Sequence, residues 1–264
     1  MKELKRVYTN KGIEEKYRKK LNKLALAMGA SVMYWVLAEY GNRTSLEMAR
    51  AIQKRIKQWK KVFGAKSEDL AIWFVTSIRK QVEADMRNSF RSVGLKMRED
   101  VPQNIVKAVQ VENNQLITSI PQKYFTGIET VAMLAILYGW NKERFKNELE
   151  KRNGIVMRRV KNITSDQAHK TTELFKRALC EENGVYFGKW TYTYRSETER
   201  IPHVQANGTI FDLRRGCLID GEYIFPGEKI NCKCTFVPVV GDIGDDMYKE
   251  VEKNIYYKRV ARGY

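Results

Sequence analysis

The segment covering residues 189–240 constrains the fold most, because the patterning of the chain changes there. Up to about residue 184, apolar side chains recur every three or four positions, which predicts long helices. From residue 189 onward, short β-prone runs alternate with turn signals such as Asn207-Gly208 and Pro226-Gly227. The sequence therefore predicts a mainly α protein, in which a long-helix N-terminal region is followed by a compact, turn-rich α+β module.

Capping residues and prolines predict where the helices begin and end. Thr44 and Thr164 each begin a capping box, and Ser67 precedes two acidic residues, so each of the three predicts a helix start. Pro102 also predicts a start, whereas Pro121 predicts a break. The expected helices cover residues 14–39, 44–63, 67–97, 103–115, 124–139, 141–151 and 164–182.

Positive charge is concentrated in the first quarter of the chain. Residues 1–66 hold 17 basic and 5 acidic side chains, which is +12 of the net +17. Such a concentration favours a polyanionic partner, although solvated helix faces or an acidic protein neighbour would also explain it. The residues expected to contact DNA are Lys54, Arg55, Lys57, Lys60 and Lys61.

The uncharged run from residue 24 to 38 could be mistaken for a membrane span or a signal peptide. Its 15 residues fall short of the roughly 18 that a span requires, and no small-residue cleavage site follows it. We expect a helix buried on most sides and no membrane partner. Without a secretory signal, the four cysteines are expected to be made in a reducing cytoplasm.

Four side chains of the C-terminal module are candidate metal ligands: His203, Cys217, Cys232 and Cys234. Imidazole and thiolate groups are the usual ligands of a structural zinc ion, and four of them complete a tetrahedral site. The Cys-x-Cys spacing is tighter than the common Cys-x2-Cys, so three alternatives stay open. Cys232 and Cys234 could pack on one face of a strand, Cys217 could form a disulfide with either, or a cysteine could be a nucleophile with His203 as base.

An ordered set of motifs runs through residues 115–240, about half of the chain. Its members are Ser119-Ile120-Pro121, Gly139, Asn153-Gly154-Ile155, Arg158-Arg159, Asp166-Gln167, Lys170, Gly184, Trp190, Arg200, His203, Asn207-Gly208, Phe211, Pro226-Gly227-Glu228 and Ile230-Asn231-Cys232-Lys233-Cys234. This set resembles the Mu protein F-like minor head proteins of tailed phages. Ser165 departs from it, because arginine is common at that position in the family.

The resemblance implies a minor capsid protein that acts in head morphogenesis of a tailed phage or prophage. Such a protein is made in the host bacterial cytoplasm and lies in the virion, inside the capsid, where it associates with the portal protein and contacts packaged double-stranded DNA. It is not expected to be an enzyme. The alternatives are a hydrolase or nuclease that uses His203 and nearby cysteines, and a general basic DNA-binding protein.

The expected divisions of the chain follow from these patterns. They are a basic helical region over residues 1–118, the helical part of the family-like region over 119–184, a compact Cys/His-containing module over 185–241 and a tail over 242–264.

Overall fold

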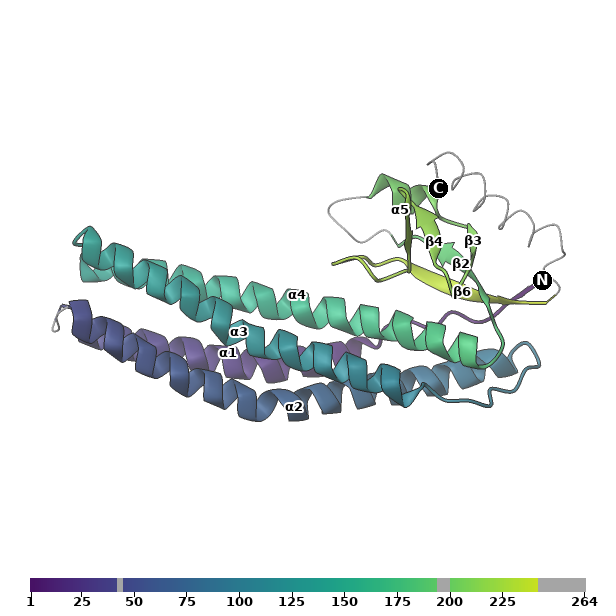
Figure 1. The fold of residues 1–264 in the computed structure, drawn as a ribbon, viewed down its shortest axis with the longest axis horizontal. Helices are drawn as coiled ribbons and strands as arrows, with labels where there is room; N and C mark the ends of the chain where they lie inside the picture. The colour runs from purple at the N-terminus through teal and green to yellow at the C-terminus, as the bar shows by residue number, and fades with distance from the viewer. Residues whose placement is uncertain (42–44, 194–199, 242–264) are drawn as a thin grey trace. The chain divides into compact units, whose positions relative to one another are not determined.

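Four long helices dominate the computed structural model, which describes residues 1–41, 45–193 and 200–241 (Figure 1). The long helices are α1 (Lys11–Glu39), α2 (Ser45–Arg91), α3 (Gln103–Leu137) and α4 (Lys142–Glu182). The smaller elements are β1 (Lys2–Glu3), β2 (Phe187–Thr191), α5 (Ile201–Gln205), β3 (Ile210–Asp212), β4 (Cys217–Ile219), β5 (Glu222–Ile224) and β6 (Thr235–Val240). The predicted fold class, mainly α with a small α+β module, is confirmed. The expected tail over 242–264 and the Thr44 capping box lie outside the described residues.

The chain divides into two compact units, neither of which is one continuous segment. The helical unit comprises residues 10–78 and 103–168, and the sheet unit comprises residues 1–9, 79–102 and those from His169 onward. The expected divisions at residues 118 and 184 differ from these, because α3 is continuous past residue 118 and the end of α4 belongs to the sheet unit. The N-terminal nine residues therefore fold with the C-terminal module.

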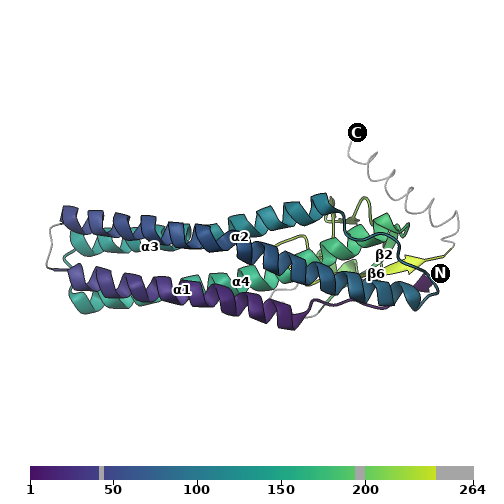
Figure 2. The ribbon, with the colours of Figure 1, turned by 90° about the horizontal axis from the view of Figure 1, so that it is seen from below.

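In the helical unit, segments of all four long helices lie lengthwise beside one another (Figure 2). Tyr17 of α1 stacks on Phe74 of α2 with ring centroids 4.1 Å apart, and both rings are fully buried. The Tyr17 hydroxyl donates a hydrogen bond to Asn113 of α3 at 3.3 Å. Asn113 in turn donates to Gln167 of α4, so one buried polar chain joins three helices inside the apolar core.

Two predicted helix starts are wrong, because Ser67 and Thr164 lie inside α2 and α4. The Ser67 hydroxyl donates to the carbonyl of Gly64, and the Thr164 hydroxyl donates to the carbonyl of Val160. Each side chain thus bonds backward along its own helix instead of capping a new one. Both hydroxyls are buried within faces that the apolar pattern continues without interruption.

The breaks predicted at Pro121 and after residue 151 are also absent. Pro121 is buried in α3 between Ile117 and Phe125, so packing on both sides of it outweighs the hydrogen bond that its ring removes. Asn153 accepts a hydrogen bond from the Tyr124 hydroxyl at 2.6 Å and packs against Gly29 of α1. The helix continues through Asn153 because its side chain contacts α3 and α1 instead of ending the helix.

The helix ends predicted at residues 139 and 182 are confirmed to within two residues, and a glycine lies at or just after each of them. Gly139 and Gly184 have φ angles of +54° and +74°, which L side chains rarely adopt. At each stop the following residue, Trp140 or Val185, donates its backbone N–H to a carbonyl five residues earlier. This is the closing pattern of a helix that ends on a left-handed glycine.

Helix α1 is buried on one face only, so the expectation of burial on most sides is wrong. Tyr17, Leu21 and Met28 are fully buried, whereas Leu26 and Tyr34 keep 59% and 68% of their surface exposed. Among the described helices, α1 is long and apolar enough to cross a membrane by length and composition, and 33% of its most apolar stretch is buried. The apolar run therefore has a solvent-facing side.

The sheet unit contains an antiparallel sheet with strand order β1-β6-β2-β3 and a separate β4–β5 hairpin. In the central pair, Trp190 of β2 lies opposite Phe236 of β6, and Trp190 is fully buried. The hairpin turns at Asp220-Gly221, where both φ angles are positive, as a two-residue hairpin loop requires. The expected change from long helices to short β-prone runs near residue 189 is confirmed by β2, which covers Phe187–Thr191.

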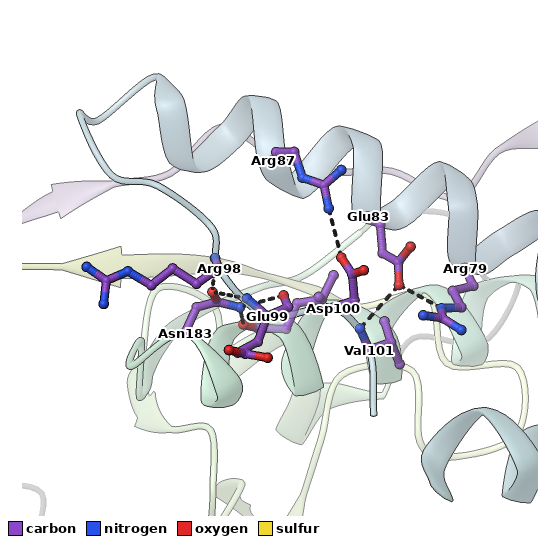
Figure 3. Close-up of polar contacts among 9 residues, drawn as sticks. Arg79, Glu83, Arg87, Arg98, Glu99, Asp100, Val101 and Asn183 are labelled. Atoms are coloured by element: carbon purple, nitrogen blue, oxygen red, sulfur yellow. Dashed lines mark hydrogen bonds and ion pairs between the residues drawn. The ribbon is translucent and has the colours of Figure 1, made fainter. Parts of the chain in front are cut away.

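A polar clamp holds the segment between α2 and α3 within the sheet unit (Figure 3). The Asn183 side chain accepts hydrogen bonds from the backbone N–H groups of Arg98 and Glu99 at 2.7 and 3.0 Å, and donates to the Glu99 carbonyl. Glu83 accepts from the backbone of Val101, so the segment is fastened at two places. These bonds satisfy backbone groups that would otherwise lack partners in an irregular segment.

Candidate metal centre

Three of the four predicted ligands meet in the sheet unit. The Nδ1 atom of His203 lies 3.5 Å from the Sγ of Cys232 and 3.6 Å from the Sγ of Cys234. All three ligand atoms lie within 4.8 Å of one another, and all three side chains are buried. This group could hold a metal ion.

The short helix α5 presents His203 to the two cysteines. Arg200, just before α5, donates a hydrogen bond to the backbone carbonyl of Ile230 at 2.9 Å, which ties the start of the helix to the cysteine loop. Pro202 lies in the first turn, where its missing N–H costs nothing. The His203 ring packs edge-on against the Trp190 indole, with centroids 5.5 Å apart, so its rotation is restricted.

The cysteines lie in the loop just before β6, and the expectation that they share a strand is wrong. The backbone N–H of Cys232 donates to the carbonyl of Lys229, and Asn231 has a φ of +59°, so the chain makes a tight turn at this point. Asparagine tolerates this left-handed conformation better than most residues. The turn brings both sulfur atoms toward His203.

His169 of α4 supports the cysteine loop from the other side. Its Nε2 lies 2.8 Å from the carbonyl oxygen of Cys234, and because a carbonyl can only accept, Nε2 is the donor. Its Nδ1 then accepts from the Thr9 hydroxyl at 3.0 Å. Nothing local to His169 in the sequence indicates this role.

A buried ion pair anchors the strand that follows the loop. Lys176 of α4 is fully buried, and its ammonium group donates to both carboxylate oxygens of Glu173, at 2.9 and 3.0 Å, and to the Thr235 hydroxyl at 2.8 Å. A fourth contact reaches the carbonyl of Phe236 at 3.2 Å. The pair therefore fixes the first residues of β6, directly after Cys234.

Gly227 lies where only glycine fits. Its φ is +79°, and an added Cβ would lie 3.2 Å from side-chain atoms of both His169 and Glu173. Its backbone N–H donates to the Cys232 sulfur. The close approach of the Pro226-Gly227 turn thus supplies a hydrogen bond that favours the thiolate form of Cys232.

The hydrogen bond between the two thiols shifts their pKa values in opposite directions. The hydrogen bond from the Cys234 thiol lowers the pKa of Cys232 to about 5, against the effect of burial, with further contributions from the Gly227 and Cys234 backbone and from His203. The same bond raises the pKa of Cys234, and burial raises it further. The buried indole N–H of Trp190 completes no hydrogen bond to nitrogen or oxygen in the described part of the chain and is close enough to bond the Cys234 sulfur weakly.

Cys217, the fourth predicted ligand, is not part of the group. It lies in β4, opposite Ile224, and borders a cavity of about 410 Å³ together with residues of α5 and β3. None of the four cysteines, all within the described residues, is joined in a disulfide. The hairpin position of Cys217 therefore separates it from the ligand group, and the expected four-ligand set is reduced to three.

The five basic residues expected to contact DNA follow one another along α2 in the helical unit. Lys54, Lys57, Lys60 and Lys61 are exposed, and none of them has an ion-pair partner among the described residues. Arg55 is half-buried, with its guanidinium 4.1 Å from the centre of the Trp35 ring. Four of the five side chains are therefore available to a polyanion, while Arg55 is partly held by an aromatic ring.

No family model matches the chain, and no match was found among curated proteins or solved structures.

Proposed function

We propose that the chain is a minor head protein of a tailed phage or prophage that acts in head morphogenesis, as its resemblance to the Mu protein F-like proteins implies. One observation supports this most: the motifs around His203, Gly227 and Cys232–Cys234 meet at one buried place. The Nδ1 atom of His203 lies close to both sulfurs, the backbone N–H of Gly227 bonds the Cys232 sulfur, and Asn231 turns the loop. The spacing of these motifs is thus explained by one group of residues that they bring together.

The metal is proposed to be a structural zinc ion held by His203, Cys232 and Cys234. One imidazole and two thiolates are usual zinc ligands, and the N–H donors around the sulfurs favour the thiolate form. Because a structural zinc site takes four ligands, the fourth must come from outside this group. Elemental analysis of the purified protein should give one zinc ion per chain. Cys232→Ser should abolish the zinc, whereas Cys217→Ser, which changes an equally buried cysteine outside the group, should retain it. Zinc-free wild-type protein would contradict this assignment.

The exposed lysines of α2 are proposed to contact packaged double-stranded DNA inside the capsid. Because phosphate contacts release counterions, affinity for duplex DNA should fall steeply with salt and be independent of sequence. Changing Lys54, Lys57, Lys60 and Lys61 to Gln should weaken binding and flatten the salt dependence. The matched control, which removes the same charge elsewhere, changes four other exposed lysines: Lys96, Lys107, Lys123 and Lys142. Equal losses of DNA affinity in both variants would instead support the alternative of a general basic DNA-binding protein.

Association with the portal protein is the part of the proposal that defines a head protein. Co-expression with a portal protein from the same phage or prophage should yield a complex that survives size-exclusion chromatography at physiological salt. A chain that binds DNA but leaves the portal protein unbound in this experiment would fit the general DNA-binding alternative instead.

A hydrolase or nuclease is the rival function, because His203 and the low pKa of Cys232 are typical of thiol catalysis. Burial argues against it, since His203 and both cysteines retain 5% or less of their surface exposed. We propose that the protein is not an enzyme. His203→Ala should lower the melting temperature without loss of a turnover activity; loss of a measured hydrolytic activity at unchanged stability would support the rival.

A further inference from the structure

Helix α1 carries an apolar face that the bundle leaves exposed. Leu26, Ala27, Ala30 and Tyr34 are all exposed and, at 3.6 residues per turn, lie on one side of the helix. The opposite side, with Tyr17, Leu21 and Met28 among its members, is buried in the helical unit. An exposed apolar stripe of this kind marks an interaction surface.

The same side of α1 is basic in the two turns just before Leu26. Its exposed members there are Lys16, Lys19, Lys20 and Lys23. The side therefore changes along its length, from lysine to apolar, over about 27 Å between Lys16 and Tyr34. Glu15 lies on this side as well and pairs with Lys19 at 3.4 Å, so the four lysines and one glutamate give this end of the side a net charge of +3.

We propose that this side of α1 docks onto the surface of an anionic phospholipid bilayer. Leu26, Ala30 and Tyr34 enter the boundary between headgroups and acyl chains, and the lysines bind the lipid phosphates. Tyrosine suits this depth, because its ring is apolar and its hydroxyl is polar. The helix lies in the membrane surface and does not cross it, since its other side is already buried against the rest of the helical unit.

Charge selects the lipid surface over the other occupants of such a stripe. A second copy of the chain would bring a second set of these lysines, and the basic α2 residues, to the same interface, which opposes self-association. Duplex DNA would match the lysines but offers nothing to the apolar half of the stripe. An anionic bilayer provides phosphates and hydrocarbon together. The expectation of no membrane partner was based on the length of the apolar run, which is too short for a span, whereas a helix that lies in the membrane surface needs only one exposed apolar side.

The test is flotation of the full chain with vesicles. Vesicles of phosphatidylcholine and phosphatidylglycerol should bind at low salt, and vesicles of phosphatidylcholine alone should bind at least about tenfold more weakly. The double variant Leu26→Ser/Tyr34→Ser should lose binding about tenfold or more, because it removes apolar contacts but no charge. The matched control, Ile230→Ser/Tyr223→Ser, changes two exposed apolar residues of the sheet unit and should bind like the wild type.

Three outcomes would overturn the proposal. The first is that the chain does not float with the anionic vesicles. The second is that the Leu26→Ser/Tyr34→Ser variant and the wild type float equally. The third is that sedimentation velocity detects a dimer that this variant dissociates, while no vesicles bind. The inference is independent of the proposed function, and the two can be separated. The apolar variant should retain its affinity for duplex DNA, and its melting temperature should remain within a few degrees of wild type because both side chains are exposed.

Discussion

Lys176 shows how far burial of a charge depends on its partners. The ammonium group has no exposed surface, yet all three of its protons have acceptors in Glu173, Thr235 and Phe236. A buried ion pair of this kind contributes little to stability relative to an apolar pair. Removing one partner, however, destabilises the fold strongly, because the other charge stays buried without compensation. The pair therefore specifies which residues of α4 face β6.

Lys176→Ala should destabilise the protein by about 3–5 kcal/mol, because it leaves the Glu173 carboxylate buried without its cation. Urea denaturation followed by circular dichroism measures this. The control is Lys146→Ala, which removes one partner of an exposed pair in the same helix and should cost less than about 1 kcal/mol. A similar cost in both variants would contradict the role given to Lys176.

Asp212 should make stability fall in acid. Burial raises its pKa, but the side-chain and backbone hydrogen bonds from Arg214 outweigh burial and hold the pKa of Asp212 below its usual 3.8. A carboxylate with a lowered folded-state pKa stabilises the fold above its unfolded-state pKa, and this contribution is lost as the pH falls through the folded-state value. The loss should therefore occur below about pH 4.

The measurement compares wild type with Asp212→Asn, which removes the charge at every pH. The variant should be less stable than wild type at pH 6, and the difference in unfolding free energy should shrink by pH 2.5. A difference that stays constant across this range would show that Asp212 contributes no ionic stabilisation.

The metal ligands were predictable as residue types but not as a set. His203, Cys232 and Cys234 were recognisable because imidazole and thiol groups are scarce in this sequence and three cysteines fall near one another. Cys217 has the same side chain, and only its place in the β4–β5 hairpin, which the sequence does not specify, separates it from the others. His169 was missed because its partner, the Cys234 carbonyl, lies 65 residues away.

At the scale of whole elements, long apolar faces determine the helices more than local stop and start signals do. Ser67, Thr164 and Pro121 all have the sequence context of a boundary, and all three lie inside long helices. Capping contributes about 1 kcal/mol, which the burial of several large side chains on either side exceeds. Glycine stops were predicted correctly because a positive φ cannot be replaced by packing.

Asn183 joins two elements through one side chain, which hydrogen-bonds both the 92–102 segment and the end of α4. Asn183→Ala should cost about 1–2 kcal/mol and accelerate amide hydrogen exchange in residues 98–101, because four hydrogen bonds are lost in a partly exposed site. Hydrogen exchange with mass spectrometry measures this. Arg87→Ala, which removes only an exposed ion pair to Asp100, should leave exchange nearly unchanged; equal acceleration in both would refute the clamp.

For the molecule as a whole, the sheet unit is assembled from three separate segments. Strand β1 pairs with β6, and the Ser89 hydroxyl of α2 donates to the carbonyl of Lys5 at 2.8 Å. The C-terminal module was expected to be compact over 185–241, but nothing in its own sequence indicates that residues 1–9 and 79–102 complete it.

A fragment of residues 169–264 should therefore not fold alone. It lacks β1 and the α2 segment, so the sheet edge and one side of its core would face water. Proton NMR should show poor chemical-shift dispersion for the fragment and good dispersion for the full chain. A well-dispersed fragment spectrum would mean that the other two segments are accessory.

Helices α2 and α4 each pass without interruption from one compact unit into the other, at Ile78–Arg79 and Ala168–His169. Each residue added to a helix rotates everything beyond it by about 100°. A single insertion or deletion near either point would turn the apolar stripe on one side away from the core it fills while leaving the other side correct. Related sequences should therefore vary in length at their loops, and within these two helices only by steps near whole turns, such as seven or eleven residues.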